Sequence, residues 1–159
     1  MAGPVLVDNT VILKFATVKR PEVLLQAWPG VVWTTPAVRR EYEERVAQGA
    51  VPEAAWDSLT TCDVTERGME FAARLSTRLG AGERSCFAVA YHREGLFVSD
   101  DADARKEAGR HEIPVTGTIG VLARAVEKSD ISIEEGNCLL TLIIGAGYRS
   151  PVEHLDDLL

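Results

Sequence analysis

Short apolar runs alternate with longer amphipathic segments along most of the chain. Short apolar runs bounded by polar residues are typical of parallel strands that are buried on both faces. Their alternation with amphipathic segments predicts βαβ units. We therefore expect an α/β fold in which a parallel sheet of about four or five strands is flanked by helices on both faces. The expected strands are residues 5–7, 31–33, 61–64, 96–99 and 113–116.

Several expected helices begin at residues that favour helix N-termini. Thr35 and Pro36 supply an N-cap and a proline at the first helical position, and Pro21 starts another helix. Two helices follow the last strand and predict a C-terminal extension, residues 126–159, outside a core of about residues 4–125. The helices are expected from Thr10 and over residues 21–28, 36–47, 52–59, 66–78, 83–93, 102–109, 117–128, 133–144 and 151–158.

Length and composition favour one cytoplasmic domain that spans residues 1–159. A chain of 159 residues can bury its own core, and 46% hydrophobic with 26% charged residues is ordinary for a globular protein. No apolar stretch approaches the roughly 20 residues of a membrane helix, and the N-terminus does not resemble a signal peptide. Three cysteines without metal-like pairing fit free thiols in a reducing cytoplasm. No contact with a membrane is therefore expected.

The net charge of −7 argues at first against a nucleic-acid partner. The position of the charges matters more than the total, because several of the acids are candidates for one shared metal site. Cationic side chains lie near these acids in the sequence, including Lys14, Arg39, Arg84 and Arg105. The net charge therefore does not decide between classes of partner.

Acidic residues follow two of the expected strands and begin a helix between them. Asp8 directly follows the first strand, Asp100, Asp101 and Asp103 follow the fourth, and Glu83 opens a helix. Because the carboxyl ends of parallel strands meet at one edge of a sheet, these carboxylates should converge there. Converging carboxylates repel one another unless a cation joins them. The pattern predicts a site for Mg²⁺ or Mn²⁺, since Zn²⁺ favours histidine and cysteine ligands.

Each acid also has a structural interpretation. Asp8 would serve as a helix N-cap, as would one of the acids in residues 100–103. Glu41 borders the apolar stripe of its helix and could pair with Arg45 four residues later, so both interpretations of Glu41 stay open. Glu83 shares a helix face with core positions, where an unpaired carboxylate is costly, and a metal explains its placement better.

Other site chemistries fit the sequence less well. The three histidines lack ligand spacing, and neither Ser85 nor Ser99 has an evident histidine base. The glycines of residues 80–82 and 117–120 lack the lysine of a phosphate-binding loop. A phospho-receiver domain also gathers acids at strand ends, but its acidic pair follows the first strand rather than a late one.

The order of these acids resembles that of the PIN domain, the fold of VapC-type toxins and related metal-dependent ribonucleases. Residues 5–10, Val-Leu-Val-Asp-Asn-Thr, are similar to the strand and aspartate that open the family pattern. Residues 33–41 resemble its second motif, in which a proline-started helix carries a glutamate, here Glu41. Residues 79–83 resemble the third motif, with Glu83 in place of the commoner aspartate.

A prokaryotic subgroup of toxin-like PIN proteins shares further features with this chain. They are the Gly-x-Gly-Glu sequence of residues 80–83, the Asp-Asp pair of residues 100–101 and the Gly-Thr-x-Gly-x-Leu sequence of residues 117–122. In the family pattern the fourth acid follows the third by eighteen residues, which corresponds to Asp101, and Ser99 matches a Ser/Thr position. The resemblance thus covers nearly the whole chain.

The resemblance implies a Mg²⁺- or Mn²⁺-dependent endoribonuclease that is the toxin of a toxin–antitoxin pair. RNA would be its substrate, a cognate antitoxin protein would bind it, and a homodimer is expected. The implied catalytic residues are Asp8, Glu41, Glu83 and Asp101, the implied metal ligands are Asp8, Glu83, Asp101 and Asp103, and the supporting residues are Thr10, Ser99 and Asp100.

Finer expectations follow from the same resemblance. Asp101 should be a metal ligand, whereas Asp100 should cap a helix or support the ligands. The apolar helical stretches 11–15 and 23–28 should form the groove that docks the antitoxin. Two alternatives stay open: a structure-specific DNA nuclease with the same fold, and a degenerate PIN domain that acts as a nucleic-acid or protein-binding module.

Overall fold

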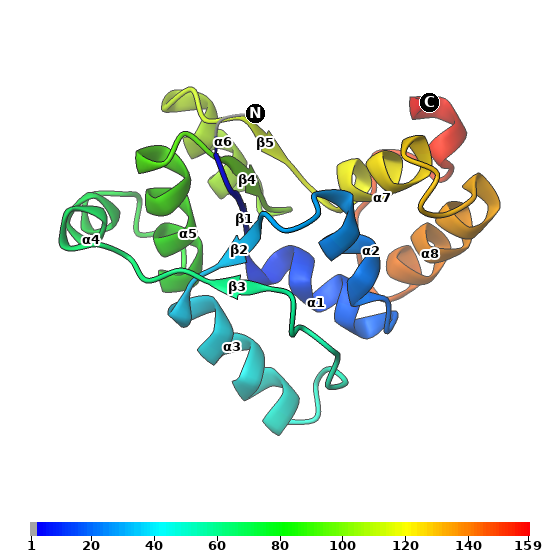
Figure 1. The fold of residues 1–159 in the computed structure, drawn as a ribbon, viewed down its shortest axis with the longest axis horizontal. Coiled ribbons are helices and arrows are strands. Elements are labelled where there is room, and N and C mark those ends of the chain that lie inside the picture. The colour runs from blue at the N-terminus through cyan, green and yellow to red at the C-terminus, as the bar shows by residue number, and fades with distance from the viewer. Residues whose placement is uncertain (1–2) are drawn as a thin grey trace.

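A computed structural model describes residues 3–159 and shows the parallel α/β architecture expected from the sequence (Figure 1). All strand pairs in the sheet are parallel, in the order β3-β2-β1-β4-β5. The central strand β1 is therefore flanked by β2 on one side and β4 on the other. The strands are β1 (Val5–Val7), β2 (Val32–Thr34), β3 (Thr60–Thr61), β4 (Leu96–Val98) and β5 (Val115–Thr116).

Helices cover both faces of this sheet. Val5, Leu6 and Val7 are fully buried, and because successive side chains of a strand point to opposite faces, neither face of β1 is open to solvent. Phe97 of β4 contacts Phe87 edge to face, with ring centroids 5.7 Å apart. The helices are α1 (Asn9–Thr17), α2 (Pro21–Ala27), α3 (Pro36–Ala47), α4 (Glu66–Ala73), α5 (Ala81–His92), α6 (Ala102–Arg110), α7 (Thr118–Glu127) and α8 (Ile133–Gly145).

Local capping explains where several helices begin. The hydroxyls of Thr35, Thr65 and Ser132 each accept a backbone N–H from the first turn of the helix that follows. The last predicted helix, residues 151–158, is reduced to a single 3₁₀ turn at Leu155–Leu158. Across residues 3–159, no helix has the length and apolar character needed to cross a membrane.

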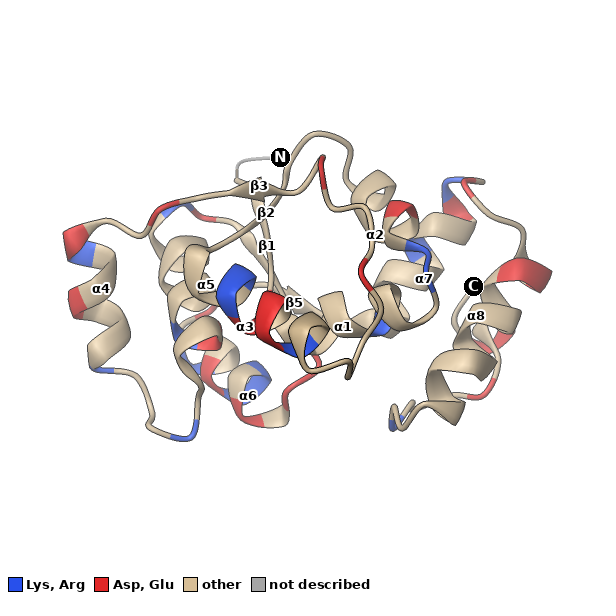
Figure 2. Cartoon of the chain, turned by 90° about the horizontal axis from the view of Figure 1, so that it is seen from below, with Lys and Arg blue, Asp and Glu red and all other residues tan. Residues whose placement is uncertain are grey.

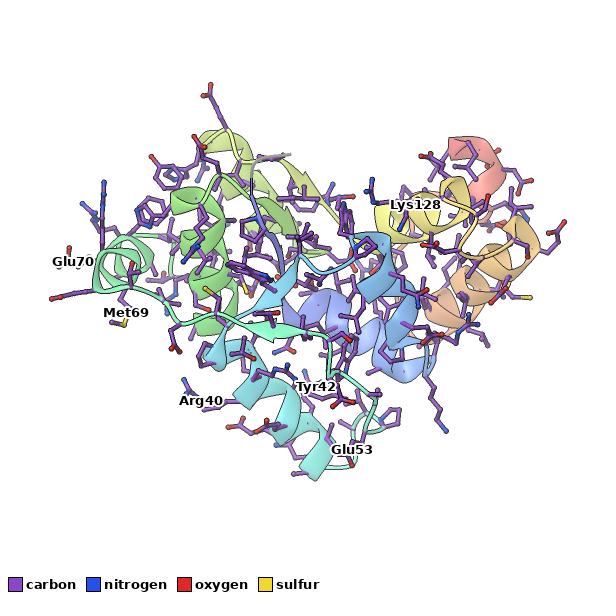
Figure 3. All side chains as sticks on the ribbon, in the orientation of Figure 1. Arg40, Tyr42, Glu53, Met69, Glu70 and Lys128 are labelled. Carbon is purple, nitrogen blue, oxygen red and sulfur yellow. The ribbon has the colours of Figure 1, made fainter. Side chains whose placement is uncertain are left out.

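The helix predicted over residues 52–59 is wrong, since this segment is irregular. The Tyr42 hydroxyl donates to the Pro52 carbonyl (3.3 Å) and accepts the Ala54 N–H (3.1 Å). Trp56 is buried and its ring lies edge-on to Tyr42, with centroids 6.1 Å apart. Tyr42 and Glu53, a residue of this segment, are labelled in Figure 3. Contacts with α3 thus replace the backbone hydrogen bonds that a helix would have made.

The two stretches predicted to dock an antitoxin lie largely in the core. Val11, Ile12 and Phe15 of α1 are at most 2% exposed, and Val23 and Leu24 of α2 are equally buried. Their apolar faces pack within the domain, so the prediction of a docking groove over residues 11–15 and 23–28 is wrong. The amphipathic pattern indicated burial correctly, but it did not show that the chain itself supplies the cover.

Candidate active site

The carboxyl ends of β1 and β4 lie side by side where the strand order reverses. Val7 pairs with Val98, so Asp8 and Ser99, which follow them, leave the sheet together. From β1 the chain moves outward to β2 and β3 on one side, and then to β4 and β5 on the other. Such a reversal is where open α/β sheets bind ligands. The strands carry no charged residue, and the strands labelled in Figure 2 are tan throughout. The acids Asp8 and Asp100 instead lie just beyond the ends of β1 and β4.

Asp8 is the N-cap of α1, and only one of its carboxylate oxygens is used for that purpose. Oδ1 accepts the Thr10 backbone N–H at 3.0 Å and the Thr10 hydroxyl at 2.5 Å. Oδ2 is buried and accepts no hydrogen bond. Burial raises the pKa of Asp8 to about 6, although the nearby Ser99 and Thr10 hydroxyls oppose this shift. Asp8 therefore caps α1 with one oxygen, as its structural interpretation predicts, and keeps the other oxygen unpaired.

Glu83 repeats this arrangement on α5. Its Oε1 accepts the Gly80 backbone N–H at 3.2 Å, whereas Oε2 is buried without a hydrogen-bond partner. Burial is the largest cause that raises the pKa of Glu83 to about 7, and the charges of Asp8 and Asp101 add to it. These charge effects indicate that Asp8, Glu83 and Asp101, three of the four predicted ligands, lie near one another.

Asp101 is the N-cap of α6. Its Oδ2 accepts the Ala104 backbone N–H at 2.8 Å, and its own N–H donates to the Ser99 hydroxyl at 3.2 Å. The sequence left open which acid of residues 100–103 caps this helix, and the structure assigns the cap to Asp101. Asp8, Glu83 and Asp101 thus each bind a backbone N–H at the start of a different helix, and three helix N-termini converge on the site. Their dipoles favour the ionised carboxylates.

Asp100 lies beside these acids, but its carboxylate is fully engaged. Oδ1 accepts the Thr118 backbone N–H at 2.8 Å. Oδ2 accepts the Thr118 hydroxyl and the Lys14 ammonium group, each at 2.6 Å. Asp100 therefore ties the start of α7 to α1 and has its charge balanced by Lys14, which fits the supporting role predicted for it.

Glu41 is engaged in the same way. Its Oε1 accepts the Gly82 backbone N–H at 3.1 Å, and its Oε2 accepts the Asn9 side-chain amide at 3.0 Å. A Cβ atom at Gly82 would lie 2.9 Å from Oε1, so any larger residue here would require the Glu41 carboxylate to move. Glu41 holds the first turn of the helix that carries Glu83. No local pattern indicates the contact between Asn9 and Glu41, because the two residues are 32 positions apart in the chain.

Asp103 has a different environment from the other predicted ligands. Its side chain is 43% exposed, and its Oδ1 lies 3.9 Å from the Arg78 guanidinium group. It occupies the first turn of α6, where its charge favours the helix dipole. The structure therefore places Asp103 in a surface ion pair.

The donor atoms fit an oxygen-preferring cation, although they are not a ready-made ligand group. Within residues 3–159, no three His, Cys, Asp or Glu side chains lie close enough to count as a metal-binding group. Asp8 Oδ2 and Glu83 Oε2 are nevertheless buried and unpaired, which is costly for carboxylates that lack a partner. Carboxylate oxygens are the ligands that Mg²⁺ prefers. A divalent cation would offset both the burial of these carboxylates, which is the main cause of their raised pKa values, and the smaller repulsion from the neighbouring acids.

Comparison with protein families matches residues 4–159 to the family model DUF3368, which is described as a PIN domain. A comparison with curated proteins gave no match. PIN domains are generally nucleases, and they typically use divalent metals. The match covers the sheet, the converging acids and the C-terminal helices together.

Proposed function

The chain belongs to the PIN-domain family, and from this we propose that it is a metal-dependent endoribonuclease that cleaves RNA phosphodiester bonds. One observation carries the metal dependence. Asp8 Oδ2 and Glu83 Oε2 are buried without hydrogen bonds beside Asp101, at the strand-order reversal where a ligand is expected.

Asp8, Glu83 and Asp101 are the residues that would hold Mg²⁺ or Mn²⁺. When bound, such a cation promotes ionisation of water and stabilises the oxygen that leaves during phosphodiester cleavage. The carboxylates must be ionised to bind it, and the helix N-termini that they cap favour that state.

Glu41, Thr10 and Ser99 act as positioning residues in this proposal. Glu41 fixes the start of the helix that carries Glu83, through its bond to the Gly82 N–H. The Thr10 hydroxyl fixes Asp8 Oδ1 and leaves Oδ2 unpaired, and the Ser99 hydroxyl fixes the backbone of Asp101. Residues that orient metal ligands commonly change affinity by 10–100-fold when they are replaced.

The choice of RNA and of a toxin role rests on the motif resemblance. The Asp-Asp pair of residues 100–101 and the Gly-x-Gly-Glu sequence of residues 80–83 are those of a toxin-like subgroup. In this proposal the enzyme works in the cytoplasm as a homodimer, and a cognate antitoxin inhibits it by placing an arginine among the unpaired carboxylates, which an arginine can bind bidentately. Because residues 11–15 and 23–28 are largely buried, this proposal places the antitoxin on another surface.

The test is cleavage of a panel of structured and single-stranded RNAs and DNAs, with Mg²⁺, Mn²⁺ or a chelator present. We expect RNA cleavage that the chelator abolishes and that Asp8→Asn lacks. Asparagine is a good N-cap, so this variant keeps the start of α1. Cleavage of DNA alone would support the DNA-nuclease alternative, and binding without cleavage would support a degenerate binding module.

A further inference from the structure

A small cavity of about 220 Å³ lies beside the converging acids and has cationic walls. Asp100, Arg105, Gly117, Tyr148 and Arg149 contribute to its lining. We propose that this cavity, the Arg105–Arg149 pocket, binds a backbone phosphate of the nucleic-acid strand next to the phosphate that is cleaved. The proposal rests on the proposed nuclease function, because it assigns part of the same substrate.

The charge balance of the pocket is positive. Asp100 would repel a phosphate, but both of its oxygens accept hydrogen bonds and Lys14 lies 2.6 Å from one of them. Among the ion pairs of residues 3–159, none joins Arg105 or Arg149 to a carboxylate. Two arginines without acidic partners among these ion pairs therefore line the cavity, and guanidinium groups bind phosphate bidentately.

Short-range contacts join this pocket to the acids. The Arg105 guanidinium group donates to the Ser99 carbonyl at 3.2 Å, immediately before the Asp100–Asp101 pair. A Cβ atom at Gly117 would clash with the Asp100 carboxylate and lie 3.2 Å from Arg105. Glycine thus lets the start of α7 approach both side chains. A phosphate in this pocket would be held from the same strand end that carries Asp101.

The C-terminal extension supplies the other wall. Tyr148 also lines a second cavity of about 310 Å³, together with Thr10 and Lys14, and the Lys14 ammonium group lies 4.7 Å from the centre of the Tyr148 ring. Cavities on both sides of Tyr148 therefore extend from Thr10, the partner of Asp8, to Arg149. This arrangement gives the segment after α8 a direct part in holding the substrate strand.

Arg149→Gln is the main test, with Arg67→Gln as its matched control. Both arginines are exposed, and Arg67 lies on α4, at the opposite end of the molecule from α8 in Figure 1. Binding of a fluorescent single-stranded RNA is measured by anisotropy in chelator at several salt concentrations. We expect Arg149→Gln to weaken binding about fivefold and to lower the slope of log K against log salt by about one, as loss of one phosphate contact predicts. Arg67→Gln should change neither quantity.

Single methylphosphonates, which remove the charge of one phosphate, locate the contact. At one position in the RNA, the methylphosphonate should weaken binding to the wild-type protein. The same methylphosphonate should not weaken binding to Arg149→Gln any further, because that variant has already lost the contact. Three results would contradict the proposed phosphate pocket. They are equal binding by Arg149→Gln and Arg67→Gln, additive losses from Arg149→Gln and the methylphosphonate at every RNA position, and no binding of any RNA strand. Failure of the nuclease proposal is distinguishable, because an Arg149-dependent salt slope without any cleavage would retain the pocket and reject the activity.

Discussion

The hydroxyl of Thr10 lies 2.5 Å from Oδ1 of Asp8 and donates a hydrogen bond to it. The same hydroxyl oxygen accepts the backbone N–H of Asp100 at 2.8 Å. One side chain therefore joins the end of β1 to the end of β4 and fixes the aspartate whose other oxygen is unpaired. The Thr10 hydroxyl is the contact that sets the geometry at the centre of the site.

Thr10→Val should separate this positioning role from simple packing. The valine keeps the shape but leaves the Asp100 N–H without its partner, which should lower the free energy of unfolding by about 1–3 kcal/mol. It should also weaken Mn²⁺ binding by roughly 10–100-fold, because Asp8 loses its orienting bond. Urea unfolding and calorimetric Mn²⁺ titration measure the two effects, and Thr10→Ser should retain both. Equal Mn²⁺ affinity of the two variants would contradict the positioning role.

Replacing Glu83 should reduce stabilisation by metal. A cation that binds only the folded protein stabilises it by about 2.7 kcal/mol at a concentration 100 times Kd, and the melting temperature rises accordingly. Glu83→Gln should show a much smaller rise with millimolar Mg²⁺ or Mn²⁺ than the wild type. Glu70→Gln is the control, since Glu70 lies exposed on α4 (Figure 3). The same rise in both variants would remove Glu83 from the ligand set.

The metal-free protein should become less stable as the pH rises from about 4 to about 7. Burial raises the pKa of Asp8 to about 6 and that of Glu83 to about 7, so the folded state binds more protons than the unfolded state in this range. Their stabilising effect is complete below the unfolded pKa values and is lost as the pH passes the folded ones. Urea unfolding in chelator should show this decline, and Asp8→Asn should flatten it. Saturating Mn²⁺ should reverse it, because the ionised carboxylates bind the cation.

Replacing Asp100 and replacing Asp101 should have different effects, one on stability and the other on turnover. Asp101→Asn should reduce turnover by more than about 100-fold with little change in stability, since asparagine can still cap α6. Asp100→Asn should chiefly lower stability, by about 1–3 kcal/mol, because Lys14 loses its ionised partner. Turnover is measured on RNA under single-turnover conditions and stability by urea unfolding. The reverse ranking of the turnover losses would assign the ligand to Asp100.

The strands and their acids were predictable because the information is local. An apolar run that ends in Asp8 needs no knowledge of the rest of the chain, and the parallel sheet then brings Asp8 and Asp101 to one edge. The irregular path of residues 52–59 was not predictable, since the Tyr42 hydroxyl that bonds this segment comes from another element. The Asn9–Glu41 contact was not predictable either, because it also joins two different elements.

Gly82→Ala should damage the site through Glu41. The new Cβ would lie 2.9 Å from Glu41 Oε1, and the side chain can move away only by losing its bonds to the Gly82 N–H and to Asn9. Alanine ordinarily stabilises a helix by about 1 kcal/mol relative to glycine, so any loss of stability reports this clash. We expect a net loss of about 1–2 kcal/mol and weaker Mn²⁺ binding, since Glu83 follows in the same turn.

Gly109→Ala is the control for this change. Gly109 lies in α6, and a Cβ atom there would meet nothing within 4 Å, so alanine should raise the free energy of unfolding by about 0.5–1 kcal/mol. Urea unfolding of both variants and calorimetric Mn²⁺ titration provide the comparison. Equal stabilisation by the two substitutions would show that the Glu41 side chain moves away from the new Cβ atom without lowering the free energy of unfolding. It would then not hold the start of α5, and the position of Glu83 would depend on the Gly80 N–H contact instead.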